Sequence, residues 1–363
     1  MLKLCQNKYF FVSSFVKFVK HFNFNIKKNT MKNHLKLWKV AFILFATAFL
    51  AGCSSDEEGI AATTKSTIVG IATTNQTNLT TFVTALNRFP DLVATLNGPG
   101  NFTAFVPSNA AFTTFLASTP YATVNDVPLI ALREILLNHV VSGSYTSVAV
   151  AGATTLSTGY VKTLGKGSAS TTITLSLFVN VGTNVRLNGV STVTTADVLA
   201  SNGIVHLIDG VIGLPTIVTH AVANPNFSTL AAVVTSTGGA YGNQSAVATA
   251  LTTNTTPLTV FAPVNAAFTA ALAPGAWANG ATATQITKVL QYHVTGAGNV
   301  LAATLTQGQV IPMITSPVQN TTIDLVGGAK IKDTQNISAN IVVIDVQCAN
   351  GVIHAVDKVL RPF

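Results

Sequence analysis

SNGIVHLIDGVI, residues 201–212, returns later in the chain as ANGVIHAVDKVL, residues 349–360. Two earlier landmarks repeat in the same order. NFTAFVPSNAAF (101–112) returns as PLTVFAPVNAAF (257–268), and LREILLNHVV (132–141) returns as ITKVLQYHVT (286–295). Self-similarity over a long period indicates duplicated structural units. The sequence therefore predicts two homologous domains, residues 66–214 and 215–363.

Each unit mixes helical and strand-like patterns. Apolar residues at Leu79, Phe82, Val83 and Leu86 follow the spacing of an amphipathic helix. Ser108 and Asn265 occupy positions where a helix would be capped, directly after strand-like stretches. Runs such as TTITLSLFVNV (171–181) and ISANIVVIDV (337–346) are typical of antiparallel strands. The fold class indicated is α+β.

His206 and Asp209 are polar residues inside an otherwise apolar strand-like stretch. Side chains alternate faces along a strand, so these two point apart and cannot form a catalytic pair in an unbulged strand. Apolar neighbours on both faces indicate a strand that is covered on both sides.

The neighbouring turn suggests a partner for the histidine. If Asn202 and Gly203 form a two-residue turn, Leu199 lies opposite His206 and Asp197 lies diagonally on the same face. We expect a structural hydrogen bond from His206 to Asp197 or to nearby backbone, with a catalytic or ligand-binding role as the alternative. The structural motif comprises Asn202, Gly203, His206 and Asp209 in the first unit, and Asn350, Gly351, His354 and Asp357 in the second.

The positive charge of the chain is concentrated at its start. The net charge is +8, yet nine of the 20 Lys and Arg residues precede Cys53 and no acidic residue does. The remaining 11 basic and 12 acidic residues leave the rest of the chain with a net charge of about −1. Nucleic-acid binding draws its affinity from neutralised phosphates, so a nearly neutral body argues against nucleic acid as a partner.

The first 52 residues are interpreted as a leader. From Met31, a basic start, the apolar run VAFILFATAF and LAGC (50–53) follow in the order of a signal peptide, with an anchor helix as the alternative. LAGC resembles a bacterial lipobox, which implies cleavage before Cys53 and its lipidation. Either the start of the protein has been assigned too far upstream and Met31 is the true start, or the first 30 residues are an unusually long basic region of the signal peptide.

A flexible tether is expected over residues 53–65. Its segment SSDEEG (54–59) resembles an export tag of surface-exposed lipoproteins, or serves only as a solvated spacer. Several acyl chains on Cys53 would give a stable membrane anchor. The expected location is the cell envelope, as an outer-membrane lipoprotein exposed at the surface.

Residue patterns for catalysis or metal binding are missing from the sequence. It contains no GxSxG, HExxH, paired CxxC or GxxxxGK[ST] motif, and its histidines are scattered singly. We therefore expect no enzymatic activity, no metal site and no cofactor. Cys348 aligns with Ala200 of the first unit and is expected to be a buried small residue rather than a reactive thiol.

The repeated landmarks resemble a fasciclin domain, twice. NFTAFVPSNAAF and PLTVFAPVNAAF are similar to the first signature block of that family. DVLASNGIVHLIDGVIGLP (197–215) and DVQCANGVIHAVDKVLRP (345–362) are similar to the second. The resemblance implies two tandem fasciclin-like domains, each a β-sandwich wedge with helices packed on one side.

The resemblance also implies candidate binding residues. In animal members of the family, an Asp-Ile motif and a Tyr-His pair have been assigned to receptor binding. The matching positions here are Asp197, Val198 and Leu199, then Asp345 and Val346, and finally Tyr292 and His293. Asn138 replaces the tyrosine in the first unit and Gln347 departs from the first motif, so a purely architectural role is the alternative.

The function that the resemblance implies is adhesion. We expect a lipid-anchored cell-surface protein that attaches cells to a matrix protein, a glycan or another cell, as in a biofilm, without catalysis. A surface binding protein that takes up a glycan or lipid ligand is the alternative.

Overall fold

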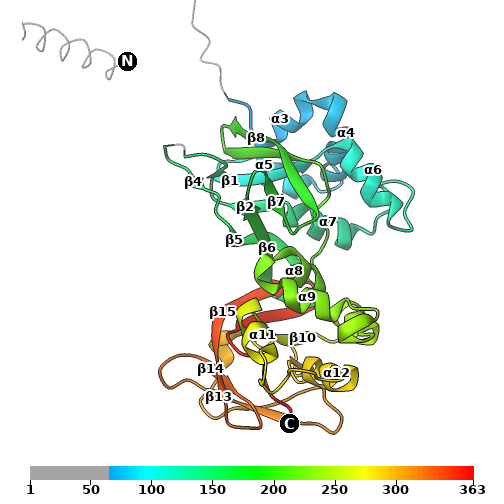
Figure 1. The fold of residues 1–363 in the computed structure, drawn as a ribbon. Helices are drawn as coiled ribbons and strands as arrows, with labels where there is room; N and C mark the ends of the chain where they lie inside the picture. Colours follow the sequence, from blue (N-terminus) through cyan, green and yellow to red (C-terminus); the bar gives the residue numbers. More distant parts are fainter. Residues whose placement is uncertain (1–64, 150) are drawn as a thin grey trace, which may run out of the picture. The chain divides into compact units, whose positions relative to one another are not determined.

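Each of the two domains begins with helices and ends with strands (Figure 1). The computed structural model describes residues 65–149 and 151–363. The leader, Cys53 and most of the tether lie outside the described residues. In the part of the chain that is described, no helix is long and apolar enough to cross a membrane.

The first domain packs five helices against its strands. The helices are α3 (Ile68–Thr74), α4 (Gln76–Leu86), α5 (Pro90–Asn97), α6 (Asn109–Ala117) and α7 (Leu129–Asn138). The strands are β1 (Phe102–Pro107), β2 (Val140–Ser142), β3 (Tyr145–Thr146), β4 (Thr154–Thr155), β5 (Gly159–Gly167), β6 (Ser170–Val181), β7 (Val185–Leu187), β8 (Ser191–Ala200) and β9 (Gly203–Ile208).

The strands of the first domain close into a barrel in the order β1-β2-β5-β6-β7-β8-β9, beside the small β3-β4 pair. Strand β9 runs parallel to β1 and antiparallel to β8. The expected wedge with helices on one side is thus a barrel-like sheet with helices packed over it.

The second domain repeats this order. Its helices are α8 (Ile217–Ala223), α9 (Ser228–Val234), α10 (Ser245–Thr253), α11 (Asn265–Leu272) and α12 (Ala283–Gln291), with 3-10 turns η1 (Pro225–Phe227), η2 (Gly239–Tyr241) and η3 (Ala302–Thr304). Its strands are β10 (Leu258–Pro263), β11 (Val294–Thr295), β12 (Val310–Pro312), β13 (Asn320–Asp324), β14 (Lys330–Lys332), β15 (Ser338–Cys348) and β16 (Gly351–Val356). They form a seven-stranded sheet in the order β11-β10-β16-β15-β14-β13-β12.

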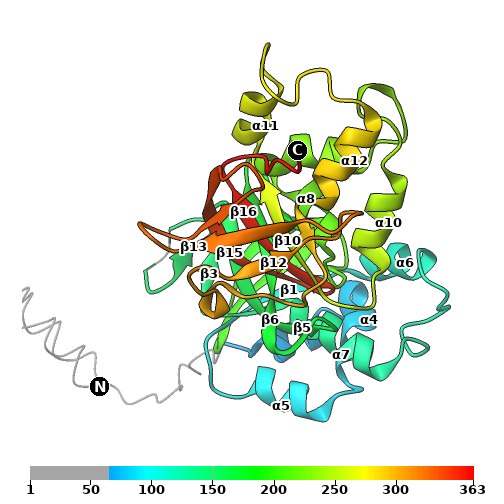
Figure 2. The ribbon, with the colours of Figure 1, turned by 90° about the horizontal axis from the view of Figure 1, so that it is seen from below.

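The central strands of both domains are buried on both faces, as the sequence predicts. On β10, Val260 and Ala262 pack against the helices, where α10 and α12 flank the strands (Figure 2). Phe261, between them, packs into a second cluster among the strands. In the first domain, alternate side chains of β1 likewise pack against the helices and into a second cluster among the strands. This double burial fixes the position of β9 and β16, which carry His206 and His354.

One of the two predicted helix caps, Asn265, was wrong. The helix α11 is preceded by Val264, and Asn265 is its first residue. The Asn265 side chain instead accepts a hydrogen bond from Thr229 N and so holds α9. Ser108 does cap its helix, because its hydroxyl accepts from Ala111 N. The two helices therefore begin at equivalent positions of the repeats, but only the first is capped by a side chain.

The turn before β9 lies one residue earlier than predicted. Ala200 pairs with Gly203, so Ser201 and Asn202 form the turn and Leu199 lies opposite Ile204. The register of β8 then shifts between Thr195 and Val198. This shift is a β-bulge, which the alternation of the sequence does not reveal.

Candidate functional site

The bulges in β8 and β15 each place one aspartate in an unusual backbone conformation. Asp197 has φ +62° and Asp345 has φ +55°, in the left-handed region that few residues other than glycine adopt. Asp197 Oδ1 accepts from Ser147 N at 2.8 Å, and Asp345 Oδ1 accepts from Ala302 N at 2.8 Å. Each bulge thus fastens the segment that follows a short strand, β3 in the first domain and β11 in the second.

His206 braces the first bulge through its ring nitrogens. Nδ1 accepts a hydrogen bond from Asp197 N at 3.3 Å, so the ring proton lies on Nε2, which donates to Tyr145 O at 2.9 Å. The Asp197 carboxylate lies 3.9 Å from Nδ1. The predicted bond therefore goes to the backbone of Asp197, and the carboxylate turns to Ser147.

His354 repeats this arrangement in the second domain. Its Nδ1 accepts from Asp345 N at 3.4 Å, and its Nε2 pairs with Val300 O at 2.9 Å. Both histidines stack on a phenylalanine of the parallel strand, Phe105 at 5.3 Å and Phe261 at 5.6 Å between ring centroids. Burial is the main cause that lowers the pKa of both imidazoles.

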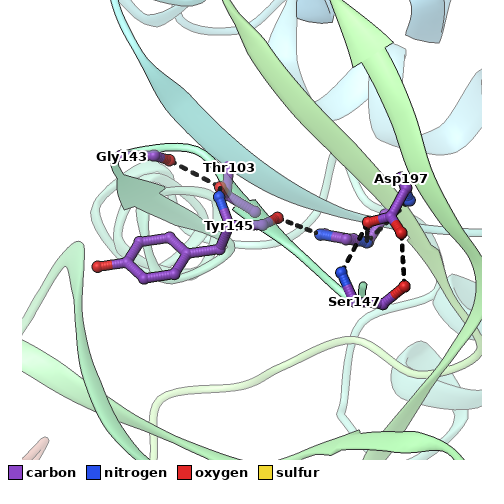
Figure 3. Close-up of polar contacts among 6 residues, drawn as sticks. Thr103, Gly143, Tyr145, Ser147 and Asp197 are labelled. Carbon is purple, nitrogen blue, oxygen red and sulfur yellow. Dashed lines mark hydrogen bonds and ion pairs between the residues drawn. The ribbon is translucent and has the colours of Figure 1, made fainter. Parts of the chain in front are cut away.

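Ser147, Asp197 and His206 lie near one another, but in an order that does not suit nucleophilic catalysis. In a nucleophilic site the serine would donate its proton to the imidazole of His206. The Ser147 hydroxyl instead donates to Asp197 Oδ2 at 2.5 Å (Figure 3). Both nitrogens of His206 are already engaged with backbone. This geometry supports bracing of the bulge rather than proton transfer.

The aligned binding residues differ in their accessibility. Leu199 is 45% exposed, and Asp197, Val198 and Asp345 are half-buried. Val346 is only 2% exposed.

The Tyr-His pair is buried too. Tyr292 is 0% exposed and donates its hydroxyl to Asn320 O, while His293 is 3% exposed. These two side chains cannot contact a partner in this conformation.

A larger exposed apolar surface adjoins the second bulge. Val342, Val343 and Ile344 of β15 are 52%, 40% and 53% exposed. The sequence predicts an antiparallel strand here but does not indicate which of its side chains are exposed, so sequence reasoning missed this surface. The register of β15 shifts on both sides of Val343, so the regular alternation of faces is broken along this stretch.

The two other aspartates of the repeated motif, Asp209 and Asp357, hold neighbouring strands together. Asp209 accepts from Thr192 N at 2.6 Å and Asp357 accepts from Asn340 N at 2.7 Å, so each ties the end of its strand to the neighbouring one. Cys348 is 0% exposed, as predicted, and burial raises the pKa of its thiol. Within residues 65–149 and 151–363, no cluster of three or more His, Cys, Asp or Glu could hold a metal ion.

A second pair of histidines, which the sequence did not single out in this role, fastens the ends of the domains. His139 Nδ1 donates to Ile135 O at 2.7 Å, and its Nε2 accepts from Ile212 N at 2.9 Å. His293 makes the matching bonds to Val289 O and Leu360 N, at 2.7 and 2.9 Å. Burial lowers the pKa of both imidazoles to about 4.

We expect mild acid to destabilise the protein through these two histidines. The ordinary pKa of a histidine is 6.5, whereas the pKa of each of these two is about 4 in the folded protein. Between these pH values the unfolded chain therefore binds protons that the folded chain excludes. The stabilisation is complete above pH 6.5 and is lost as the pH falls toward 4. The cost is about 1.4 kcal/mol per pH unit for each histidine.

Urea unfolding at several pH values between about 7 and about 5 measures this loss. Replacing His139 by Gln should flatten the pH dependence at the expense of stability at neutral pH. Equal free energies of unfolding across this range would contradict the prediction.

Comparison with known proteins agrees with the duplicated architecture. The model of the fasciclin domain family matches residues 77–215 and again residues 225–362. Protein sll1483 of Synechocystis sp. is 38% identical over 146 residues, which are 40% of this chain and 72% of that protein. Transforming growth factor-beta-induced protein ig-h3 of Sus scrofa is 32% identical over 114 residues, 31% of this chain and 15% of that protein.

One solved structure, described as a FAS1 domain pair from the insect cell adhesion molecule fasciclin I, has a TM-score of 0.45 and 21% sequence identity. The match covers 76% of this chain and 97% of that one. The two family matches together span well over half of the chain, in the region where the structure repeats its helices, strands and histidine-braced bulges. The chain therefore belongs to the fasciclin family, with two tandem domains.

Proposed function

We propose that this chain is a cell-surface adhesion protein, held to a membrane through lipid on Cys53, that attaches cells to a matrix protein, a glycan or another cell. The observation that carries the proposal is the presence of two complete fasciclin domains in succession. A relative, ig-h3, is similar to 31% of this chain, and the arrangement around His206 and His354 favours bracing over catalysis.

Two domains on one anchored chain favour attachment through many weak contacts. Linked sites gain avidity because the second contact forms at a high effective concentration. The exposed surface of Val342–Ile344, together with Leu199, offers apolar contact area beside the bulges. Charged residues make up only 9% of the chain, so contact would rest on polar and apolar groups more than on ion pairs.

The proposal predicts that loss of the anchor lowers cell attachment. Replacing Cys53 by Ala should release the protein from the membrane, and biofilm mass or cell aggregation should fall toward the level of a gene deletion. The readouts are the membrane-bound fraction of the protein and the retained biomass.

A second pair of variants separates surface contact from anchoring. Replacing Val342 and Ile344 by Thr should weaken attachment while the protein stays on the membrane, whereas Val326→Thr, at a side chain that is 70% exposed, should leave it unchanged. Undiminished attachment in the deletion strain, under conditions where the wild-type strain makes the protein, would refute adhesion.

A further inference from the structure

A groove of about 560 Å³ lies where β6, β7 and the turn after β7 in the first domain meet α8 and α10 of the second. The described residues 65–149 and 151–363 belong to one compact unit, and the groove lies within it. Its volume is in the range of ligand sites, about 300 to 1,000 Å³. It is separate from the two bulges, since none of Asp197, Asp345, His206 and His354 lines it.

Arg186 supplies the positive charge of this groove. It is exposed on β7, and one of its N–H groups donates from Nη2 to Gly189 O at 2.8 Å, which orients the guanidinium. Among the described residues Arg186 takes part in no ion pair, and no Asp or Glu lines the groove. The guanidinium has five donors in a planar fork, so most remain available for a carboxylate.

Amide and hydroxyl groups surround this guanidinium. Asn180 of β6 is paired directly with Arg186 across the two strands, so both side chains lie on the same face of the sheet. Asn188 is 2% exposed, and its Nδ2 has no hydrogen-bond partner among the described residues. A buried amide donor without a partner is costly in a folded protein. Asn188 lines the groove, and this unpaired Nδ2 lies buried just beneath its surface.

The opposite wall is more apolar. Val222 of α8 is 61% exposed into solvent and lines the groove together with Thr219, and Thr252 of α10 adds a hydroxyl group. Gly189 lies against this wall, because a Cβ there would approach Ala223 Cα to 3.3 Å. The groove therefore combines one positive charge, several neutral polar groups and a small aliphatic surface.

We propose that this groove binds a carboxylated sugar, such as a uronic acid unit of an acidic polysaccharide. A single guanidinium balances a single carboxylate, whereas a phosphate monoester would call for more positive charge. The amides and hydroxyls match sugar hydroxyl groups, and the aliphatic side chains contact the C–H face of the ring. The inference goes beyond adhesion, because the groove would bind its ligand whether or not the chain attaches cells.

Titration of the purified protein with trigalacturonate, followed by calorimetry at low salt, tests the proposal. We expect saturable binding that Arg186→Gln weakens by about tenfold or more, because hydrogen bonds to charged groups are the stronger ones. Arg361→Gln, which alters an arginine outside the groove, should bind as the wild-type protein does. Neutral galactotriose should bind at least about tenfold more weakly than trigalacturonate.

A steric variant keeps the test independent of charge. Val222→Trp should block the groove and abolish binding, and an unchanged melting temperature would show that the fold is intact, as expected for an exposed position. Absence of trigalacturonate binding would overturn the proposal, as would equal affinity for the neutral trisaccharide. Wild-type affinity in the Arg186 variant would overturn it as well.

Discussion

Gly203→Ala is expected to unfold the first domain. Gly203 opens β9 at the point where this strand pairs with Phe102 of the parallel strand β1. A Cβ at Gly203 would overlap the carbonyl oxygen, carbon and backbone nitrogen of Phe102, all of which are backbone atoms that cannot move aside. Gly351 meets Leu258 in the same way in the second domain. We expect each substitution to cost more than about 4 kcal/mol, the range reserved for severe steric or packing defects.

Gly159→Ala is a matched control for this effect. Gly159 has φ +156° and Gly203 has φ +153°, but a Cβ at Gly159 meets no atom within 4 Å. The two substitutions therefore share the backbone strain and differ in the collision. Differential scanning calorimetry should show loss of a folding transition for Gly203→Ala and only a modest shift for Gly159→Ala. Similar melting temperatures for the two variants would rule out the collision as the cause.

Asn202→Ala is expected to give the second largest loss of stability. The Asn202 side chain accepts from Ile68 N at 3.0 Å and donates to Leu96 O and Gly98 O at 2.8 and 2.9 Å. It thus joins the start of α3 and the end of α5 to the turn before β9. Alanine would leave buried backbone groups without partners, at about 1 to 3 kcal/mol each. We expect a total loss of about 3 kcal/mol or more.

Ser201→Ala is the control for this prediction, because Ser201 lies in the same turn and is exposed. Its backbone N donates to Ser66 O, a bond that alanine keeps. Chemical denaturation should therefore separate the two neighbours clearly. Asn350 repeats the role of Asn202 through Ile217 N and Leu251 O, so Asn350→Ala should destabilise the second domain. A loss below about 1 kcal/mol for Asn202→Ala would contradict the prediction.

Much of the fold could be predicted because it depends on local patterns. The helix at Leu79–Leu86 follows from the spacing of its apolar residues, and α4 spans Gln76–Leu86. The apolar residues on both faces of β9 predicted its double burial. Repetition itself predicted two domains, and the family matches show them.

The candidate site was less predictable. The alternation rule placed Asp197 diagonally from His206, but the bulge brings its backbone N to the ring and turns its carboxylate to Ser147. The positive φ of Asp197 leaves no mark in the pattern of apolar residues. Likewise, the exposure of Val342–Ile344 reflects a register shift within β15 rather than its composition.

By itself the sequence determined the duplication, the α+β class, the main helices and the absence of familiar catalytic motifs, because these depend on residue order and short-range spacing. Only the tertiary structure decided that Gly203 must be glycine, that His139 holds Ile212, and that Arg186 faces α8 across a groove. In each of these cases the deciding contact joins residues that are distant in sequence. Such contacts arise from strand pairing and domain packing, which no local pattern records.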